Sequence, residues 1–322
     1  MKKSHFWAGS VLFAALAFGC GSSDTAPSSA EPKASSSDAL VLPGDQYYPE
    51  SISATDDGTI FVSSVGTGEV VKFAPGSSEA TVFIGSGDPP NASGVFAEPK
   101  SSTLYLCAFL DLTKMPPPNE VRAYDLDSGA LKAKYAFSGP SFCNDFAIDQ
   151  AGNTFVTDSV GKIYELAAGA TSLAVWSADP LLAPSSVTGV GADGIAFDGH
   201  GNLYVNTFDS GRLVRIPILA DGSAGSATEL ELPAPLQNPD GMRMLDETTL
   251  ILVEGGAGRL TKVTVSGNAA TTSTLADGLS GPTSVVDVAG RYWVTEGQLG
   301  HFLGTIPGSP TLPFHVKRIP TM

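Results

Sequence analysis

The fold is decided by a stretch that recurs along the chain: Asp193-Gly194-Ile195-Ala196-Phe197-Asp198-Gly199-His200-Gly201-Asn202-Leu203-Tyr204-Val205. Similar stretches begin at Pro49, Asn144 and Asp240, and weaker copies begin near Gly94 and Pro282. Self-similarity at a period of about 45–50 residues is typical of a repeat architecture. The sequence therefore contains six copies of one structural unit.

Each copy has the composition of a short antiparallel sheet. An apolar strand leads into a turn of Asp, Gly or Asn, which tolerate a positive φ, and a second strand of β-branched and aromatic residues follows. A third strand often comes next, as in residues 211–216. Six such sheets of three to four strands predict an all-β fold, a six-bladed β-propeller.

The two ends of the repeat region predict how the ring closes. A single blade cannot cover its own apolar faces, so six blades have to pack in a circle. Residues 39–42 have the pattern of an early strand, and residues 314–319 have that of a late one. We expect these two strands to meet in one blade and fasten the ring.

Composition excludes several classes of protein. The 322 residues are 42% hydrophobic and only 16% charged, and they include 36 Gly and 23 Pro, so disorder and a charged helical bundle are both excluded. The formal net charge is −15, which argues against nucleic acid as a partner, because phosphates need clustered Lys and Arg. We expect a monomer that binds a small molecule.

The N-terminus has the features of an export signal. Lys2 and Lys3 precede an apolar run, residues 6–18, that is short for a membrane span, and Cys20 follows. This resembles a bacterial lipoprotein signal over residues 1–20, with Cys20 lipidated; ordinary secretion is the alternative. Residues 21–38 predict a flexible tether, and residues 39–322 the propeller. By analogy with enteric bacteria, Gly21 favours the outer membrane, facing the periplasm or the cell surface, with the lipid as the only membrane contact.

Two cysteines remain in the folded part, Cys107 and Cys143. An exported protein meets an oxidising compartment, where two cysteines can pair. The sequence leaves two alternatives open, a disulfide between them or two buried thiols.

Polar residues occupy the same position in successive repeats. The start of the first strand carries Glu50, Asn144, Asp193 and Asp240, with Thr283 and Ser93 or Gly94 in the other two copies. In a propeller these positions converge at one mouth of the central channel. Crowded carboxylates require a counter-charge. Oxygen ligands without His or Cys indicate Ca²⁺, or alternatively Mg²⁺ or Mn²⁺. Each residue taken alone also fits a turn or a strand cap.

A second set of polar residues lies at the ends of the second strands: Ser63, Asp158, Asn206, Glu254 and Glu296. Strand alternation returns these ends to the same mouth. They either orient the candidate ligands or cap strands.

Four of these stretches resemble one known family. Pro49-Glu50-Ser51, Cys143-Asn144-Asp145, Ala192-Asp193-Gly194-Ile195-Ala196 and Pro239-Asp240-Gly241-Met242 are similar to the senescence marker protein/gluconolactonase superfamily, which includes luciferin-regenerating-enzyme-like proteins and calcium-dependent phosphotriesterases. The resemblance covers about residues 45–320. It implies a divalent cation held by Glu50 and Asp240, with Asp193 in the place of a ligand Asn and Asn144 beside the substrate. The blades also resemble NHL repeats, which are often binding scaffolds.

One departure from the family bears on the substrate. Sugar-lactonase members carry an Arg two residues before the channel Asn, where this chain has Phe142. A gluconolactone is therefore not the expected substrate.

Two functions follow from this reading. In the first, the protein is a metal-dependent hydrolase of a lactone or related ester. The cation polarises the carbonyl, Asp240 (or a partly freed Asp193) activates water, and Asn144 positions the substrate. In the second, the propeller is not an enzyme and binds a ligand or protein partner, and its metal is structural.

Overall fold

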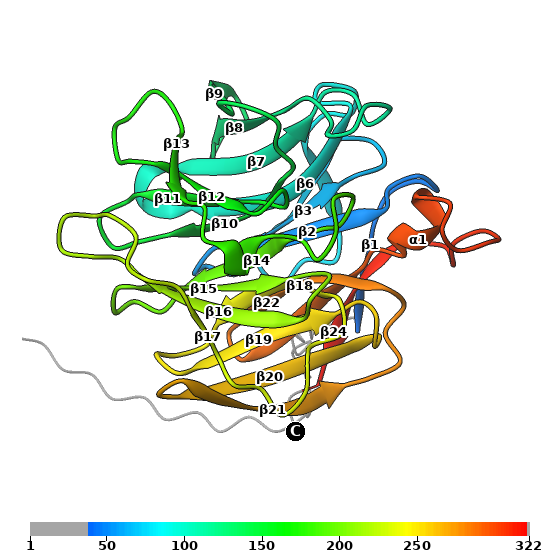
Figure 1. Ribbon diagram of the computed structural model, residues 1–322. Helices are drawn as coiled ribbons and strands as arrows, with labels where there is room; N and C mark the ends of the chain where they lie inside the picture. The colour runs from blue at the N-terminus through cyan, green and yellow to red at the C-terminus, as the bar shows by residue number, and fades with distance from the viewer. Residues whose placement is uncertain (1–37, 321–322) are drawn as a thin grey trace, which may run out of the picture. The chain divides into compact units, whose positions relative to one another are not determined.

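The computed structural model describes residues 38–320, which form six four-stranded antiparallel sheets (Figure 1). The signal over residues 1–20, its Cys20 and nearly all of the tether lie outside the described residues. The six sheets are the blades of a β-propeller, which confirms the predicted fold.

The first strand of each blade lies nearest the axis. These strands are β2 (Pro49–Ala54), β6 (Asn91–Glu98), β10 (Cys143–Ile148), β14 (Ala192–Phe197), β18 (Pro239–Met244) and β22 (Pro282–Val288). Each contacts the first strand of the next blade, and β22 contacts β2, so the ring is closed. The second strands are β3 (Ile60–Ser64), β7 (Thr103–Phe109), β11 (Thr154–Asp158), β15 (Asn202–Thr207), β19 (Thr249–Glu254) and β23 (Arg291–Glu296).

The third and fourth strands complete each blade on its outer side. The third strands are β4 (Val70–Phe73), β8 (Asn119–Asp125), β12 (Lys162–Leu166), β16 (Arg212–Pro217), β20 (Arg259–Ser266) and β24 (His315–Ile319). The outermost strands are β5 (Ala80–Ile84), β9 (Leu131–Ala136), β13 (Ala174–Ser177), β17 (Thr228–Glu229), β21 (Ala269–Ala276) and β1 (Ala39–Val41). Three single-turn helices lie in loops: η1 (Pro99–Ser101), η2 (Pro180–Leu182) and α1 (Leu299–Phe302). No helix within residues 38–320 is both long and apolar enough to cross a bilayer.

The ring closes as the sequence predicts. The sixth blade has the strand order β1-β24-β23-β22, and β1 pairs with β24 through Leu40 and Val316 (Figure 1). The first blade-forming segment and the last thus share one sheet. Opening the ring would break these hydrogen bonds and expose the apolar faces on both sides.

The hydrophobic core consists of six clusters, one at each interface between neighbouring blades. Alternation along the strands sends successive side chains to opposite faces of a sheet, and each face meets the next blade. Ile195 and Val205 pack toward blade 3, for example, whereas Ala196 and Tyr204 pack toward blade 5. Every blade therefore depends on both of its neighbours.

The Asp residues of the turns act as predicted. Asp149 Oδ1 accepts hydrogen bonds from the N–H groups of Ala151 and Asn153, both at 2.9 Å. Asp198 does the same for His200 (2.7 Å) and Asn202 (3.0 Å). These side chains fix the hairpin between first and second strands, and so they set the register of the strands that reach the axis.

Blades 2 and 3 are joined by a disulfide between Cys107 and Cys143, whose Cα atoms are 5.5 Å apart. Of the two alternatives that the sequence left open, the structure has the disulfide. Cys107 lies on a second strand in the position that Ser63, Thr157 and Asn206 hold in blades 1, 3 and 4. Those three bond the next blade through a hydroxyl or amide. The disulfide is the covalent form of the same contact.

We predict that Cys107→Ala/Cys143→Ala lowers the free energy of unfolding by about 2–4 kcal/mol, because the bond closes a long loop of the unfolded chain. The measurement is denaturant unfolding of oxidised protein. Reducing agent should shift the wild-type midpoint toward that of the variant and leave the variant unchanged. Equal midpoints for wild type and variant would show that the bond does not stabilise the ring.

Candidate active site at the propeller axis

A bulge at the same place in all six innermost strands shapes the channel. In blade 3, Cys143 pairs with Asp158 and Phe146 pairs with Val156, so the first strand has one extra residue. Such an insertion breaks the strict alternation of side chains and bends the strand. It allows polar side chains at successive positions to turn toward the axis.

The bulges sit where the innermost strands approach one another most closely. A Cβ on Gly94 would lie 1.9 Å from the carbonyl oxygen of Asn144, and one on Gly194 would lie 2.4 Å from that of Asp240. Only glycine fits between backbones at this separation. The axis is consequently a tight, largely buried environment for the polar side chains beside these glycines.

The four predicted site residues come from four blades. Glu50 lies on β2, Asn144 on β10, Asp193 on β14 and Asp240 on β18. Glu50 and Asn144 are 8% exposed, Asp193 is 3% exposed, and Asp240 is partly exposed. The charges of Glu50, Asp193 and Asp240 interact with one another across the axis.

Asp193 and Asp240 are coupled carboxyl groups. Burial, followed by the charge of Asp240, raises the pKa of Asp193 well above its usual range. Burial and the charge of Glu50 also raise the pKa of Asp240. Both groups therefore bind a proton more readily than an exposed aspartate does.

Glu50 is the third buried carboxyl group. Its pKa is raised well above the usual range by burial and by the charges of Asp193 and Asp145, whereas Arg243 lowers it. Glu50 is therefore sensitive to any change in charge at the axis.

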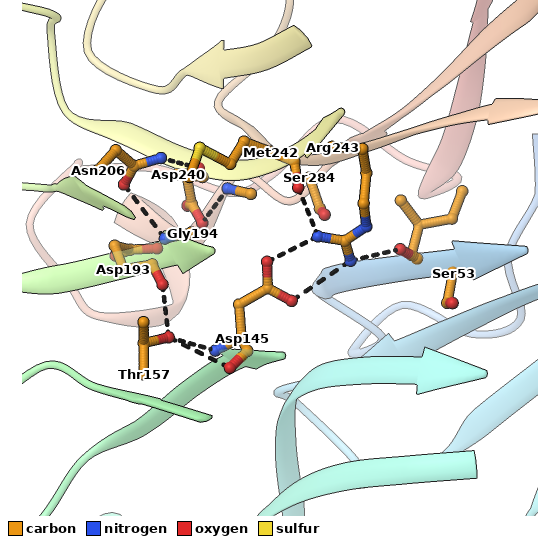
Figure 2. A network of polar contacts seen from close by, with 12 residues as sticks. Ser53, Asp145, Thr157, Asp193, Gly194, Asn206, Asp240, Met242, Arg243 and Ser284 are labelled. Atoms are coloured by element: carbon orange, nitrogen blue, oxygen red, sulfur yellow. Dashed lines mark hydrogen bonds and ion pairs between the residues drawn. The ribbon is translucent and has the colours of Figure 1, made fainter. Parts of the chain in front are cut away.

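Arg243 crosses the channel and pairs with Asp145 (Figure 2). Its Nη1 lies 2.7 Å from Asp145 Oδ2, and its Nη2 lies 3.3 Å from Asp145 Oδ1. The same guanidinium donates to the carbonyl oxygens of Met242 (2.7 Å) and Ile52 (3.3 Å), and it lies 5.6 Å from the ring of Phe96. The chain thus places its own cation among the carboxylates.

The sequence alone did not identify Asp145 and Arg243, although both lie within copies of the repeat. The expected alternation allowed only one channel-facing residue at each strand start. The bulge adds Asp145 beside Asn144 and lets Arg243 reach the axis three residues after Asp240. The available signal was an Arg in one copy of the repeat, at the position where the other copies have Ser53, Phe96, Ala147, Ala196 and Val286.

Side chains from the second strands hold the aspartates in place. Thr157 Oγ1 donates to the carbonyl oxygen of Asp193 at 2.5 Å. Asn206 Nδ2 donates to the carbonyl oxygen of Asp240 at 2.6 Å, and Asn206 Oδ1 accepts from Gly194 at 3.1 Å (Figure 2). These bonds join blade 3 to blade 4 and blade 4 to blade 5, so they fix the distance between the two carboxyl groups.

The polar ends of the second strands divide between the two predicted roles. Asn206 supports the aspartates, and Ser63 Oγ donates to the carbonyl oxygen of Ser93 at 2.6 Å. Asp158, Glu254 and Glu296 instead accept hydrogen bonds from N–H groups of the loops that lead into the first strands. These three carboxylates therefore cap the backbone of those loops, the second of the two predicted roles.

The buried oxygen atoms at the axis are of the chemical type that binds a hard cation. Asp193 Oδ1, Ser51 Oγ and Ser284 Oγ are buried oxygens on innermost strands without a hydrogen-bond partner. Such oxygens are ordinarily satisfied by water or an ion. Within residues 38–320, however, no three His, Cys, Asp or Glu side chains converge closely enough to hold a metal. A cation bound by all three predicted carboxylates therefore requires their side chains to rearrange.

An aromatic residue precedes Asn144 in the chain. Phe142 is half-buried two residues before Asn144, and its ring lies 4.9 Å from that of the buried Phe109. Asn144 Nδ2 donates to Ser159 Oγ at 3.2 Å, which orients the amide.

Surface clefts lie away from the axial cluster. A cleft of about 600 Å³ is lined by Asp56, Asp57 and Asp127 at the turns of blades 1 and 2. Another of about 380 Å³ lies between blades 2 and 3 and includes Tyr105 and Tyr135. The acidic cluster is distinguished by buried, interacting charges rather than by a wide opening.

Solved structures share this fold at low sequence identity. A luciferin-regenerating enzyme aligns with a TM-score of 0.62 at 15% identity, covering 87% of this chain and 94% of that one. A gluconolactonase from Xanthomonas campestris gives 0.60 at 15%, covering 80% and 85%. Virginiamycin B lyase from Staphylococcus aureus gives 0.54 at 12%, covering 79% and 93%. The sequence matches no family model and no curated protein. These similarities show the propeller fold alone.

We predict that Asp240→Asn stabilises the chelator-treated protein at pH 8 but not at pH 4. A carboxyl group whose pKa is raised binds its proton more tightly in the folded state, so it destabilises the fold as pH rises above its unfolded pKa of about 4. The amide removes this cost, and its oxygen keeps the 2.9 Å bond from Gly241 N–H. The melting temperature of the variant should exceed that of wild type by a few degrees at pH 8.

The matched control is Glu247→Gln, since Glu247 has an exposed side chain. It should show no such pH-dependent difference. Loss of stability in Asp240→Asn at pH 8 would contradict the assignment of a buried, repelled carboxyl group.

Proposed function

We propose that the axial cluster binds a divalent cation, Ca²⁺ in the first instance, and hydrolyses a lactone or related ester. The observation that supports this is the arrangement of Glu50, Asn144, Asp193 and Asp240 on the innermost strands of four blades, with the pKa values of the three carboxyl groups raised by burial and by one another's charge. The family resemblance of these same residues and the gluconolactonase among the structural neighbours point in the same direction.

Glu50, Asp193 and Asp240 would hold the cation, with the amide oxygen of Asn144 beside it. When bound, the cation would supply Lewis-acid chemistry that polarises a carbonyl group and stabilises developing negative charge. Asp193 would give up its proton on binding, because a cation and a proton compete for the same oxygens.

Asp240 is the proposed general base. Its pKa is raised by burial, which makes it a stronger base than an exposed aspartate, and the hydrogen bond that it accepts from Gly241 N–H orients it. It would take the proton of the attacking water. Asn144, itself oriented by Ser159, would position the substrate.

The substrate we propose has an apolar acyl or aryl portion. Phe142, supported by Phe109, offers an aromatic surface next to Asn144 but no hydrogen bond to a hydroxyl group. A polyhydroxylated sugar lactone would leave its hydroxyl groups without partners on this side, which costs binding energy.

A second candidate function is a non-catalytic propeller that binds a ligand or protein partner. One observation favours it: the carboxylates do not converge as a ready metal site within residues 38–320. In that case the Arg243–Asp145 pair would serve to balance buried charge.

We also propose that the protein is an exported, monomeric lipoprotein of the outer membrane, anchored through Cys20 and the tether. The disulfide between Cys107 and Cys143 supports export, since such bonds persist in oxidising compartments.

We predict measurable hydrolysis of aryl esters or lactones that chelator abolishes and added Ca²⁺ restores. Asp240→Asn should lower kcat by at least about 100-fold, the lower range for loss of a general base. Glu247→Gln should retain full activity. Equal rates for wild type with chelator, wild type with Ca²⁺ and Asp240→Asn would end this proposal.

We predict that kcat/KM is higher for medium-chain or aryl substrates than for sugar lactones, and that Phe142→Ala reduces this preference about tenfold or more. Phe83→Ala is the control. Phe83 lies on the outermost strand of blade 1, is likewise half-buried, and packs edge-to-face against the buried ring of Phe61. A sugar-lactone preference, or equal effects of the two substitutions, would argue against the apolar subsite.

A further inference from the structure

Arg243 is unusual among the axial residues because one side chain contacts three blades. It belongs to β18, pairs with Asp145 on β10, and donates to the carbonyl oxygen of Ile52 on β2. In the ring order these are blades 5, 3 and 1. Figure 2 shows the guanidinium bridging the channel between them.

These three strands also carry three of the four candidate site residues. Asp145 directly follows Asn144, Ile52 lies two residues after Glu50, and Arg243 itself lies three residues after Asp240. The guanidinium therefore bonds each strand within three residues of a candidate site side chain. The other five copies of the repeat lack an Arg at this position, so the repeat does not supply this link in the other blades.

We propose that Arg243 is a positioning residue that holds Glu50, Asn144 and Asp240 at the separation needed for the axial site. This inference rests on the proposed function and names the residue on which the geometry of that site depends. Two bonds to Asp145 fix the plane of the guanidinium, and the same two terminal nitrogens, Nη1 and Nη2, donate to the carbonyl oxygens of Met242 and Ile52.

The alternative role for Arg243 is that of a simple counter-charge. The two roles predict opposite effects on cation binding. A nearby positive charge repels a cation, so its removal should tighten binding if charge alone matters. If Arg243 positions the ligands, its removal should weaken binding despite the more favourable charge.

The test uses Arg243→Lys and Arg243→Met with calorimetric titration of Ca²⁺. Lysine keeps the charge but lacks the planar fork, so it cannot reproduce the paired bonds. We expect both variants to bind Ca²⁺ about 10–100-fold more weakly than wild type, the usual effect of losing a residue that orients metal ligands. Asp145→Asn should weaken binding in the same direction.

Arg215→Lys is the matched control. Arg215 also links two blades through its guanidinium, donating to the carbonyl oxygen of Gly267 (2.7 Å) and to Asn268 Oδ1 (2.6 Å), but its bonds are exposed. It should leave Ca²⁺ affinity unchanged. Tighter Ca²⁺ binding by Arg243→Met, or wild-type affinity in Arg243→Lys, would overturn the positioning role.

Hydrogen exchange of the metal-free protein separates this inference from the proposed function. If wild type binds no Ca²⁺, the proposed cation site fails, but Arg243 still has a measurable effect on the strands. Arg243→Lys should then accelerate exchange in β2, β10 and β18 relative to β14 and β22. Unchanged exchange in those three strands would overturn the inference whether or not a cation binds.

Discussion

Four carboxyl groups from four blades, three of them buried and one partly exposed, lie around one axis with the guanidinium of Arg243. Glu50, Asp145, Asp193 and Asp240 face a channel in which Arg243 is the cation that the chain supplies. Arg243 balances one carboxylate. Burial, together with the charges of the neighbouring carboxyl groups, keeps the pKa values of Glu50, Asp193 and Asp240 high, since ionising a carboxyl group beside others in a dry site is unfavourable.

The excess of carboxyl groups at the axis persists because the rest of the structure holds the innermost strands together. Apolar clusters at all six blade interfaces, the β1–β24 pairing and the Cys107–Cys143 disulfide together close the ring. Closure leaves the innermost strands no freedom to separate, so the carboxyl groups cannot relax apart. Proteins commonly store such unfavourable arrangements where they bind or react.

Much of the fold could be predicted from the sequence, because the arrangement of the blades follows from the period of the repeat. The repeat predicted six blades, the closing strands and the shared position of Glu50, Asn144, Asp193 and Asp240. The bulge could not be predicted from the sequence, since it depends on how the backbones of neighbouring blades pack at Gly94 and Gly194. Asp145 and Arg243 were missed for that reason, and with them the internal counter-charge. Whether Cys107 and Cys143 pair also required the distance between adjacent blades.

The fold alone does not decide the chemistry, since its structural neighbours include a lyase and a gluconolactonase. The most direct test is a crystal structure of the protein soaked with Mn²⁺, located by its anomalous scattering. The account predicts a peak at the axis within about 2.5 Å of oxygens of Asp193 and Asp240. A structure at saturating Mn²⁺ with no axial peak would contradict it.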